Sequence, residues 1–351
     1  MTSNDEHERK VRGKKIRSDR KEKKERSRDK KRESKEMERI QKKGGSTETS
    51  PDSTSTMQDF EIGSSFVETQ AVIEFKERLK RWMEANYPIH LIGPTGCGKT
   101  SMALNVAKER DRPVVWINGD ADLDTSDLVG EYSGKEQYSV QDKYIHNVQK
   151  SKQIINDRWV DNPLTIAVEE GATLVYNEFS RTKPAANNVL LSIFEEGVLE
   201  LPEKHGESRY VEVHPEFRSI LISNPIEYAG VHRPQDALLD RLIGIYMDFY
   251  DFETEVKIVE DQLNDELPED VVEKLVTVMR ELRENLEINI GTRAAIMAAD
   301  GLAVYDDFDR DLLGEVCLDV LASKVSKKER LGEIRREVDS IIEETPEADI
   351  G

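Results

Sequence analysis

The stretch that decides the fold reads Gly93-Pro94-Thr95-Gly96-Cys97-Gly98-Lys99-Thr100. It matches G-x-x-x-x-G-K-[ST] at every fixed position, and it lies between an apolar run typical of a buried strand, residues 88–92, and a helical pattern over residues 101–110. Glycines let backbone N–H groups curl around a phosphate, and the N-terminus of the following helix attracts the same anion. We therefore predict a nucleoside triphosphate site. Lys99 is expected to reach the β- and γ-phosphates, the Thr100 hydroxyl to ligate Mg²⁺, and Cys97 to have no redox role.

Short apolar segments alternate with helical patterns through the first two thirds of the chain. Strands are expected at residues 88–92, 113–118, 173–176, 218–223 and 243–249, and helices at 69–87, 101–110, 184–196 and 235–242. This alternation predicts an α/β domain over residues 58–252, with a parallel five-stranded sheet flanked by helices. From Glu253 onward only helical patterns occur, at residues 271–286, 293–305, 311–325 and 328–343. We therefore expect a small all-helical domain over residues 253–345.

The charge of the chain is unevenly distributed. Of 51 basic and 71 acidic residues, residues 1–50 hold 19 and 11, a net charge of +8, so the rest of the chain carries −28. Residues 1–57 are predicted to be a disordered basic arm and linker, because they lack the apolar side chains that offset the entropy cost of ordering. Two interpretations stay open for the arm: a grip on nucleic acid or an acidic partner, or a solvated linker. The net negative charge of the chain after residue 50 argues against nucleic-acid binding. It favours adaptation to high salt over the alternative of an ordinary acidic protein.

Composition also excludes several classes of protein. The two cysteines, Cys97 and Cys317, allow neither a disulfide framework nor a zinc ribbon. No apolar run approaches the ~18 residues that span a bilayer, and residues 1–32 lack the apolar core of a secretory signal. These observations predict a soluble, cytoplasmic protein.

A second acidic site is expected where the strand at residues 173–176 ends. Glu178 would polarise the attacking water, and the alternative is an ordinary exposed carboxylate. Asn177 stands where Asp is usual. Its carbonyl can hold Mg²⁺ through a water molecule but brings no charge to the metal, so slower turnover or weaker Mg²⁺ binding is expected. An inactive site is the alternative, and the presence of Glu178 argues against it.

Two further side chains fit the same scheme. Asn224 follows the strand at residues 218–223 and could orient the water, although Asn before Pro is also a common turn. Arg241 could reach the γ-phosphate of a neighbouring subunit, where such a charge can raise the rate ~10³-fold or more. The alternative is an ion pair of Arg241 with Asp236 or Asp240.

With these pieces in order, the chain resembles an AAA+ ATPase of the MoxR-type branch, and within it the gas-vesicle N protein (GvpN) family, over about residues 66–300. The resemblance rests on four blocks, residues 93–100, 171–181, 194–202 and 214–218. It implies Walker A at residues 93–100, Walker B at Asn177 and Glu178, sensor 1 at Asn224, and an arginine finger at Arg241. It also implies sensor 2 at Arg293, where the alternative is a surface residue that starts a helix.

The resemblance further implies ATP and Mg²⁺ as cofactors, a homo-oligomer that is a ring or a dimer, and a halophilic archaeal source. Gas vesicle shell or accessory proteins would be the clients, and association with the vesicle stays open. The insertion at residues 122–163 would touch the substrate, with candidate contacts that could equally be packing residues: Tyr132, Tyr138, Tyr144 and Trp159. Two rival hypotheses are a MoxR-type chaperone that activates a metalloenzyme and a nucleotide-binding protein without hydrolysis.

Overall fold

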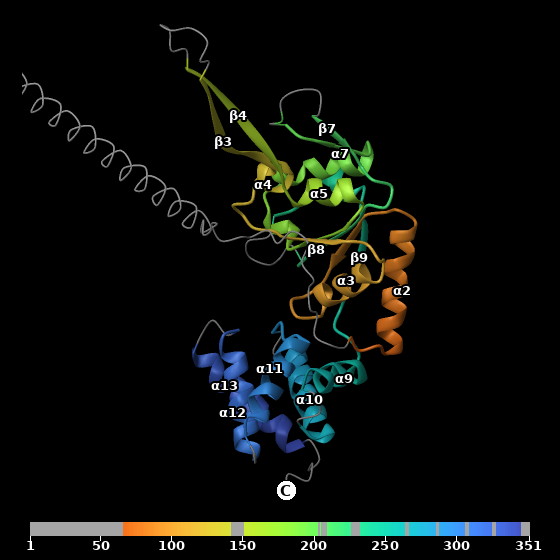
Figure 1. The fold of residues 1–351 in the computed structure, drawn as a ribbon. Helices are drawn as coiled ribbons and strands as arrows, with labels where there is room; N and C mark the ends of the chain where they lie inside the picture. Colours follow the sequence, from red (N-terminus) through yellow and green to blue (C-terminus); the bar gives the residue numbers. More distant parts are fainter. Residues whose placement is uncertain are drawn as a thin grey trace, which may run out of the picture. The chain divides into compact units, whose positions relative to one another are not determined.

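The architecture is that of a computed structural model (Figure 1). The residues it describes are 66–141, 151–202, 204, 209–225, 232–263, 267–285, 288–305, 309–324 and 328–344. The predicted disordered arm, residues 1–57, lies outside this set, and so does Tyr144. Tyr138 lies in a described strand, but its side chain is outside the described part.

A parallel sheet of five strands organises the first two thirds of the described chain, which confirms the predicted α/β class. Its spatial order is β2 (Val114–Asn118), β5 (Thr173–Asn177), β8 (Arg218–Ser223), β1 (Ile89–Ile92) and β9 (Ile243–Tyr246). Asn118 lies opposite Asn177, and Ile92 lies opposite Ser223. The carboxyl ends of these strands therefore meet at one edge, where parallel sheets place their ligands.

Helices cover both faces of this sheet, because successive strand residues point to opposite sides. Val175 of β5 joins the apolar cluster that contains α2 (Gln70–Glu84) and α3 (Lys99–Lys108). Its neighbours Leu174 and Tyr176 join the cluster on the other face. The helices that contribute to that cluster are α4 (Thr125–Val129), α5 (Pro163–Glu170), α7 (Val189–Glu195) and α8 (Asp236–Leu239). Helix α6 (Pro184–Asn187) adjoins it, because Tyr176 Oη donates a hydrogen bond to Asn187 Oδ1.

Among the helix boundaries that differ from the prediction, three concern residues near the site or the predicted arginine finger. The helix expected at residue 101 starts at Lys99, because Gly98 in a left-handed conformation serves as its N-cap. The helix expected over residues 184–196 is divided into α6 and α7 at Asn188. The helix expected over residues 235–242 ends at Leu239, so that Arg241 lies beyond it.

Two antiparallel hairpins extend this domain. Strands β3 (Gly130–Gln141) and β4 (Ser151–Asp161) pair within the predicted insertion and lie side by side in Figure 1. Tyr132 and Trp159 pack edge to face at the base of this hairpin, with ring centroids 5.1 Å apart. Trp159 Nε1 also donates a hydrogen bond to Asp161 Oδ1 at 2.6 Å. The second hairpin joins β6 (Val198–Glu200) to β7 (Tyr210–Glu212).

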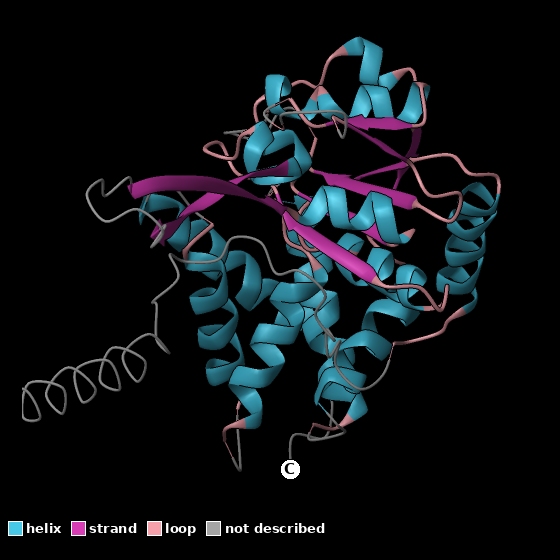
Figure 2. Ribbon diagram, turned by 45° about the horizontal axis from the view of Figure 1, so that its top comes forward, coloured by secondary structure: helices cyan, strands magenta, loops and turns pink. Residues whose placement is uncertain are grey.

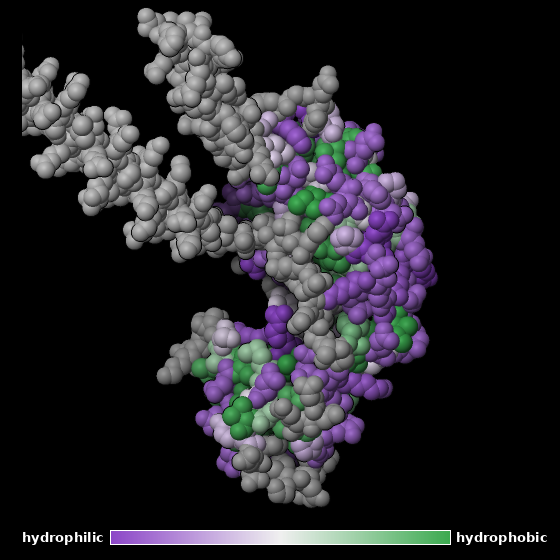
Figure 3. Space-filling model, viewed as in Figure 1, coloured by the Kyte–Doolittle hydropathy of each residue, from purple (hydrophilic) through white to green (hydrophobic). Residues whose placement is uncertain are grey.

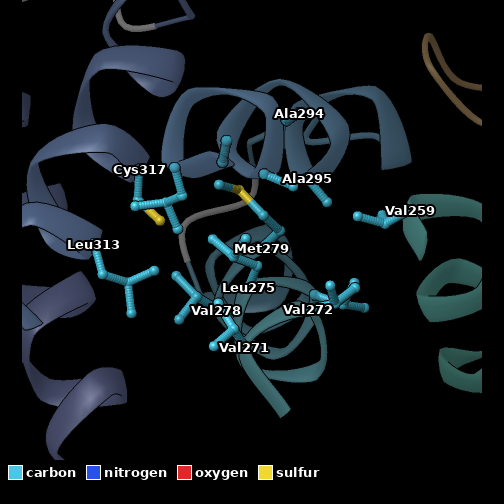
Figure 4. Packing of buried hydrophobic residues seen from close by; sticks show 14 of the residues in the cluster. Val259, Val271, Val272, Leu275, Val278, Met279, Ala294, Ala295, Leu313 and Cys317 are labelled. Atoms are coloured by element: carbon cyan, nitrogen blue, oxygen red, sulfur yellow. The ribbon is translucent and has the colours of Figure 1, made fainter. Parts of the chain in front are cut away.

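Among the described residues after β9 (Ile243–Tyr246), the regular elements are all helices, and Figure 2 shows a group of helices with no strand among them. They are α9 (Phe252–Leu263), α10 (Glu269–Asn285), α11 (Thr292–Ala303), α12 (Arg310–Ala322) and α13 (Lys328–Glu344). Figure 4 shows their common core, in which Leu275 and Met279 of α10 pack near Ala295 of α11 and Cys317 of α12. The buried residues of this cluster all lie between Val256 and Ile342. The domain boundary at residues 252 and 253 stays a prediction.

The face of the molecule in Figure 3 is largely hydrophilic, with apolar residues in small separate groups. Among the described helices, none combines the length and the apolar character that a bilayer crossing requires.

Candidate functional site

The loop at residues 93–98 connects β1 to α3 at the ligand-binding edge of the sheet. Gly96 and Gly98 have φ angles of 87° and 94°, a conformation that favours glycine over other residues. A Cβ atom on Gly96 would lie 3.2 Å from the Cα of Gly291, so the loop closely approaches the residue before α11. The loop ends at the N-terminus of α3, whose free N–H groups attract anions.

Lys99 begins α3, and its side chain turns back into the loop. Its ammonium donates hydrogen bonds to the carbonyls of Gly93 at 2.8 Å and Pro94 at 2.7 Å, and to Asn224 Oδ1 at 3.1 Å. Burial lowers the pKa of Lys99, the nearby charge of Arg293 lowers it further, and Glu178 acts in the opposite direction. A buried ammonium whose hydrogen bonds all go to uncharged oxygens gains strongly from an anion, so the loop fits a phosphate.

Thr100 and Asn177 face each other across the sheet edge. Thr100 Oγ1 donates to Asn177 Oδ1 at 3.3 Å, and Asn177 Nδ2 donates to Asn118 Oδ1 at 2.8 Å. The carbonyl oxygen of Asn177 therefore lies beside the Thr100 hydroxyl, and two hard oxygen atoms of this kind fit Mg²⁺. Sequence reasoning missed Asn118, although it is the polar residue that ends the neighbouring strand.

Glu178 and Lys99 are connected through Asn224. Asn224 Nδ2 donates to both carboxylate oxygens of Glu178, at 3.0 and 3.1 Å, while its Oδ1 accepts from Lys99. Arg181 Nε also donates to Glu178 Oε2 at 3.1 Å. Glu178 has a left-handed backbone, with φ of 51°, which turns the chain sharply after β5. The carboxylate is therefore held by defined donors, in contrast to the alternative of an ordinary exposed group.

His90, in β1, contacts residues that are adjacent in the chain to Asn224 and Glu178. Its Nε2 lies 2.7 Å from Ser223 Oγ, and its ring packs edge to face on Phe179 at 4.9 Å. Ser223 precedes Asn224, and Phe179 follows Glu178. Burial lowers the pKa of His90 to about 4, so the ring is neutral at physiological pH. A lone histidine in a strand gave no signal of this position in the sequence.

Arg293, in the first turn of α11, also lies near the phosphate loop. It lines a cavity of about 250 Å³ together with Gly96, Cys97, Ser101, Tyr250 and Thr292. The cavity begins at the phosphate loop, which is where the rest of a bound nucleotide would continue. Arg293 is exposed, and its charge reaches Lys99.

Arg241 is set apart from these residues. Its guanidinium donates to the Glu195 carboxylate on α7 and to the carbonyl of Ala237. The ion-pair partner recorded for Arg241 among the described residues is thus Glu195 instead of Asp236 or Asp240, and Asp236 pairs with Arg233 at 2.9 Å. Glu195 is 46 residues away in sequence and could not be identified as the partner.

Comparison with known proteins places the chain in a family. The model of the AAA domain (dynein-related subfamily) matches residues 88–242. The gas vesicle ATPase GvpN of Haloferax mediterranei is 60% identical over 342 residues, which cover 97% of each chain. The chain belongs to the GvpN family. Gas vesicle ATPase GvpN1 of Halobacterium salinarum is 58% identical and covers 97% of this chain and 98% of its own. GvpN of Ancylobacter aquaticus is 41% identical, with 78% of each chain covered. The resemblance predicted from the sequence is confirmed.

Proposed function

We propose that this chain binds ATP with Mg²⁺, hydrolyses it, and uses the hydrolysis to promote the assembly or growth of gas vesicles. The single observation that carries the proposal is the bridge from Lys99 through Asn224 to Glu178, because it connects a phosphate-binding cation to a carboxylate. Membership of the GvpN family supports the gas vesicle part.

Nucleotide binding would use both sides of the loop. The N–H groups of residues 95–98 and the Lys99 ammonium would hold the phosphates, and the cavity beside Tyr250 would hold the rest of the nucleotide. Thr100 would ligate Mg²⁺ directly and Asn177 through a water molecule. When bound, Mg²⁺ neutralises charge on the β- and γ-phosphates.

Hydrolysis would depend on Glu178 as the general base for the attacking water. Asn224 is positioned to orient that water, since its amide already contacts the Glu178 carboxylate. Asn177 brings no negative charge to the metal, so we propose that turnover is slow. The lack of that charge also motivates the rival in which the site binds ATP without hydrolysis.

In an oligomer, Arg241 would exchange its contact with Glu195 for the γ-phosphate of a neighbouring subunit. Hydrolysis in a ring or dimer would then act on shell or accessory proteins of the vesicle. We place this activity in the cytoplasm, at the growing vesicle.

The test is electron microscopy of a host whose vesicle genes are intact and whose copy of this gene carries Lys99→Ala or Glu178→Gln. We expect vesicles to be fewer or smaller in both strains, and growth without a need for buoyancy to be unchanged. Full-sized vesicles in normal number in both strains would overturn the assembly role and favour a chaperone for a metalloenzyme.

A further inference from the structure

A buried carboxylate that the sequence did not indicate lies next to the nucleotide site. Glu255 is in the first turn of α9, and 2% of its side chain is exposed. It accepts hydrogen bonds from Arg280 at 2.6 Å, from Arg283 at 2.9 Å and from the Thr292 hydroxyl at 2.8 Å. A buried charge is tolerated when such donors satisfy it. Removal of one partner destabilises the fold, because it leaves a buried charge without compensation.

The two arginines extend this contact to the backbone on either side. Arg280 also donates to the carbonyl of Tyr250 at 2.9 Å, in the segment that leads from β9 to α9. Arg283 donates to the carbonyl of Ile290 at 2.6 Å, and its guanidinium lies 3.8 Å from the centre of the Phe249 ring. Glu255 therefore connects the segment after the sheet with the turn that begins α11.

That turn contacts the phosphate loop. Ile290 is held by Arg283 and Thr292 by Glu255, while Gly291 between them packs on Gly96. Arg293 is the next residue and lines the cavity beside the loop. Three consecutive residues before Arg293 are thus held by contacts, although Arg293 itself is exposed.

We propose that Glu255 is a positioning residue for the nucleotide site: it holds the turn at residues 290–292 so that the Arg293 guanidinium faces the phosphates. The inference rests on the proposed function, since it assigns Arg293 to a bound nucleotide. ATP carries more negative charge than ADP, so a positioned cation stabilises ATP more than ADP. Glu255 therefore contributes to the preference for ATP without touching the nucleotide.

The test compares ATP and ADP binding, by calorimetry with Mg²⁺, in full-length wild type, Glu255→Gln, Arg293→Ala and the double variant. We expect Glu255→Gln to weaken ATP binding about tenfold, in the range of a lost charged hydrogen bond, and ADP binding less. Once Arg293 is absent, Glu255→Gln should have no further effect on ATP binding. The matched control is Glu253→Gln in the same helical turn, whose carboxylate pairs with Lys257 on the surface at 2.5 Å and whose loss should leave both affinities unchanged.

Equal loss of ATP and ADP binding in Glu255→Gln, or effects that add in the double variant, would overturn the positioning role. If Glu255→Gln does not fold, as judged by circular dichroism, Thr292→Val provides the same test. It removes one hydroxyl contact and should lower ATP affinity in the same direction by a smaller factor, and unchanged ATP affinity in Thr292→Val would then overturn the inference. Wild type that binds no ATP would overturn the proposed function itself, whereas wild type that binds ATP with no effect of Arg293→Ala would overturn only this inference.

Discussion

Asn177 is the residue at which the site departs from its expected chemistry, and Asn177→Asp tests what that departure does. The amide oxygen of Asn177 faces Thr100, and its nitrogen donates to Asn118 at 2.8 Å. A carboxylate at position 177 adds a negative charge toward the cation and loses the donor to Asn118. The lost hydrogen bond is replaced if the Asn118 amide turns and donates its N–H to the new carboxylate.

The magnitude follows from these two effects. Through a water molecule, at about 5 Å in high dielectric, one negative charge attracts a divalent cation by roughly 1.7 kcal/mol. The lost hydrogen bond to Asn118 opposes this by about 1 kcal/mol until Asn118 turns. The net gain is about 0.7 to 1.7 kcal/mol, so the Mg²⁺ concentration that half-saturates ATP binding should fall by about three- to twentyfold.

The assay is a Mg²⁺ titration of the binding of a fluorescent ATP analogue, with phosphate release measured at each concentration. Asn118→Leu should move the midpoint the other way, because it frees the Asn177 amide to turn its nitrogen toward the cation. Asn118→Asp keeps an acceptor for Asn177 and also adds a negative charge near the cation, so it should not weaken Mg²⁺ binding as Asn118→Leu does. A folded Asn177→Asp variant with weaker Mg²⁺ binding and lower activity would refute the reasoning and show that the site is built around an amide.

Three further predictions concern the loop, the buried histidine and the acidic surface. Gly291→Ala should weaken ATP binding by at least tenfold in calorimetry, because its Cβ would lie 2.7 Å from the Cα of Gly96; unchanged affinity would contradict the close approach. The pKa of His90 is about 4 in the folded chain, below its usual 6.5, so the unfolded chain binds a proton first and stability should fall by about 3 kcal/mol between pH 6.5 and pH 4. Denaturant unfolding of His90→Phe should lack that part of the pH dependence, and an unchanged slope would show that other groups cause it. The melting temperature should rise as KCl increases into the molar range, because the Debye length falls from ~10 Å at 0.1 M to ~3 Å at 1 M, and a flat profile would remove the halophilic interpretation.

The sheet and the phosphate loop could be predicted because their signals are local. Each strand is a short apolar run, and the spacing of the loop follows from how glycines and Lys99 surround a phosphate. The β3–β4 hairpin lacked such a signal, since residues 130–141 are mostly polar and the aromatic pair Tyr132 and Trp159 lies 27 residues apart. Helix α9 was missed although Val256, Val259 and Leu263 recur at helical spacing, and its buried Glu255 carried no apolar signal.

The site was predicted as a set of residues, but the contacts between them could not be. Asn224 and Glu178 are 46 residues apart, and Lys99 is 125 residues from Asn224. Their bridge depends on strand order, with β8 between β1 and β5. Asn118 and Glu255 hydrogen-bond to other side chains and belong to no sequence motif, so the sequence did not indicate them.

The measurement that tests the central claim most directly is phosphate release by wild type and Glu178→Gln, with ATP binding measured on the same samples. The Lys99 cradle is untouched in Glu178→Gln, so ATP binding should be retained while hydrolysis falls by roughly 10²- to 10⁴-fold, the contribution of a general base. Lys99→Ala should lose binding instead. Hydrolysis by Glu178→Gln at the wild-type rate would contradict the assignment of the site.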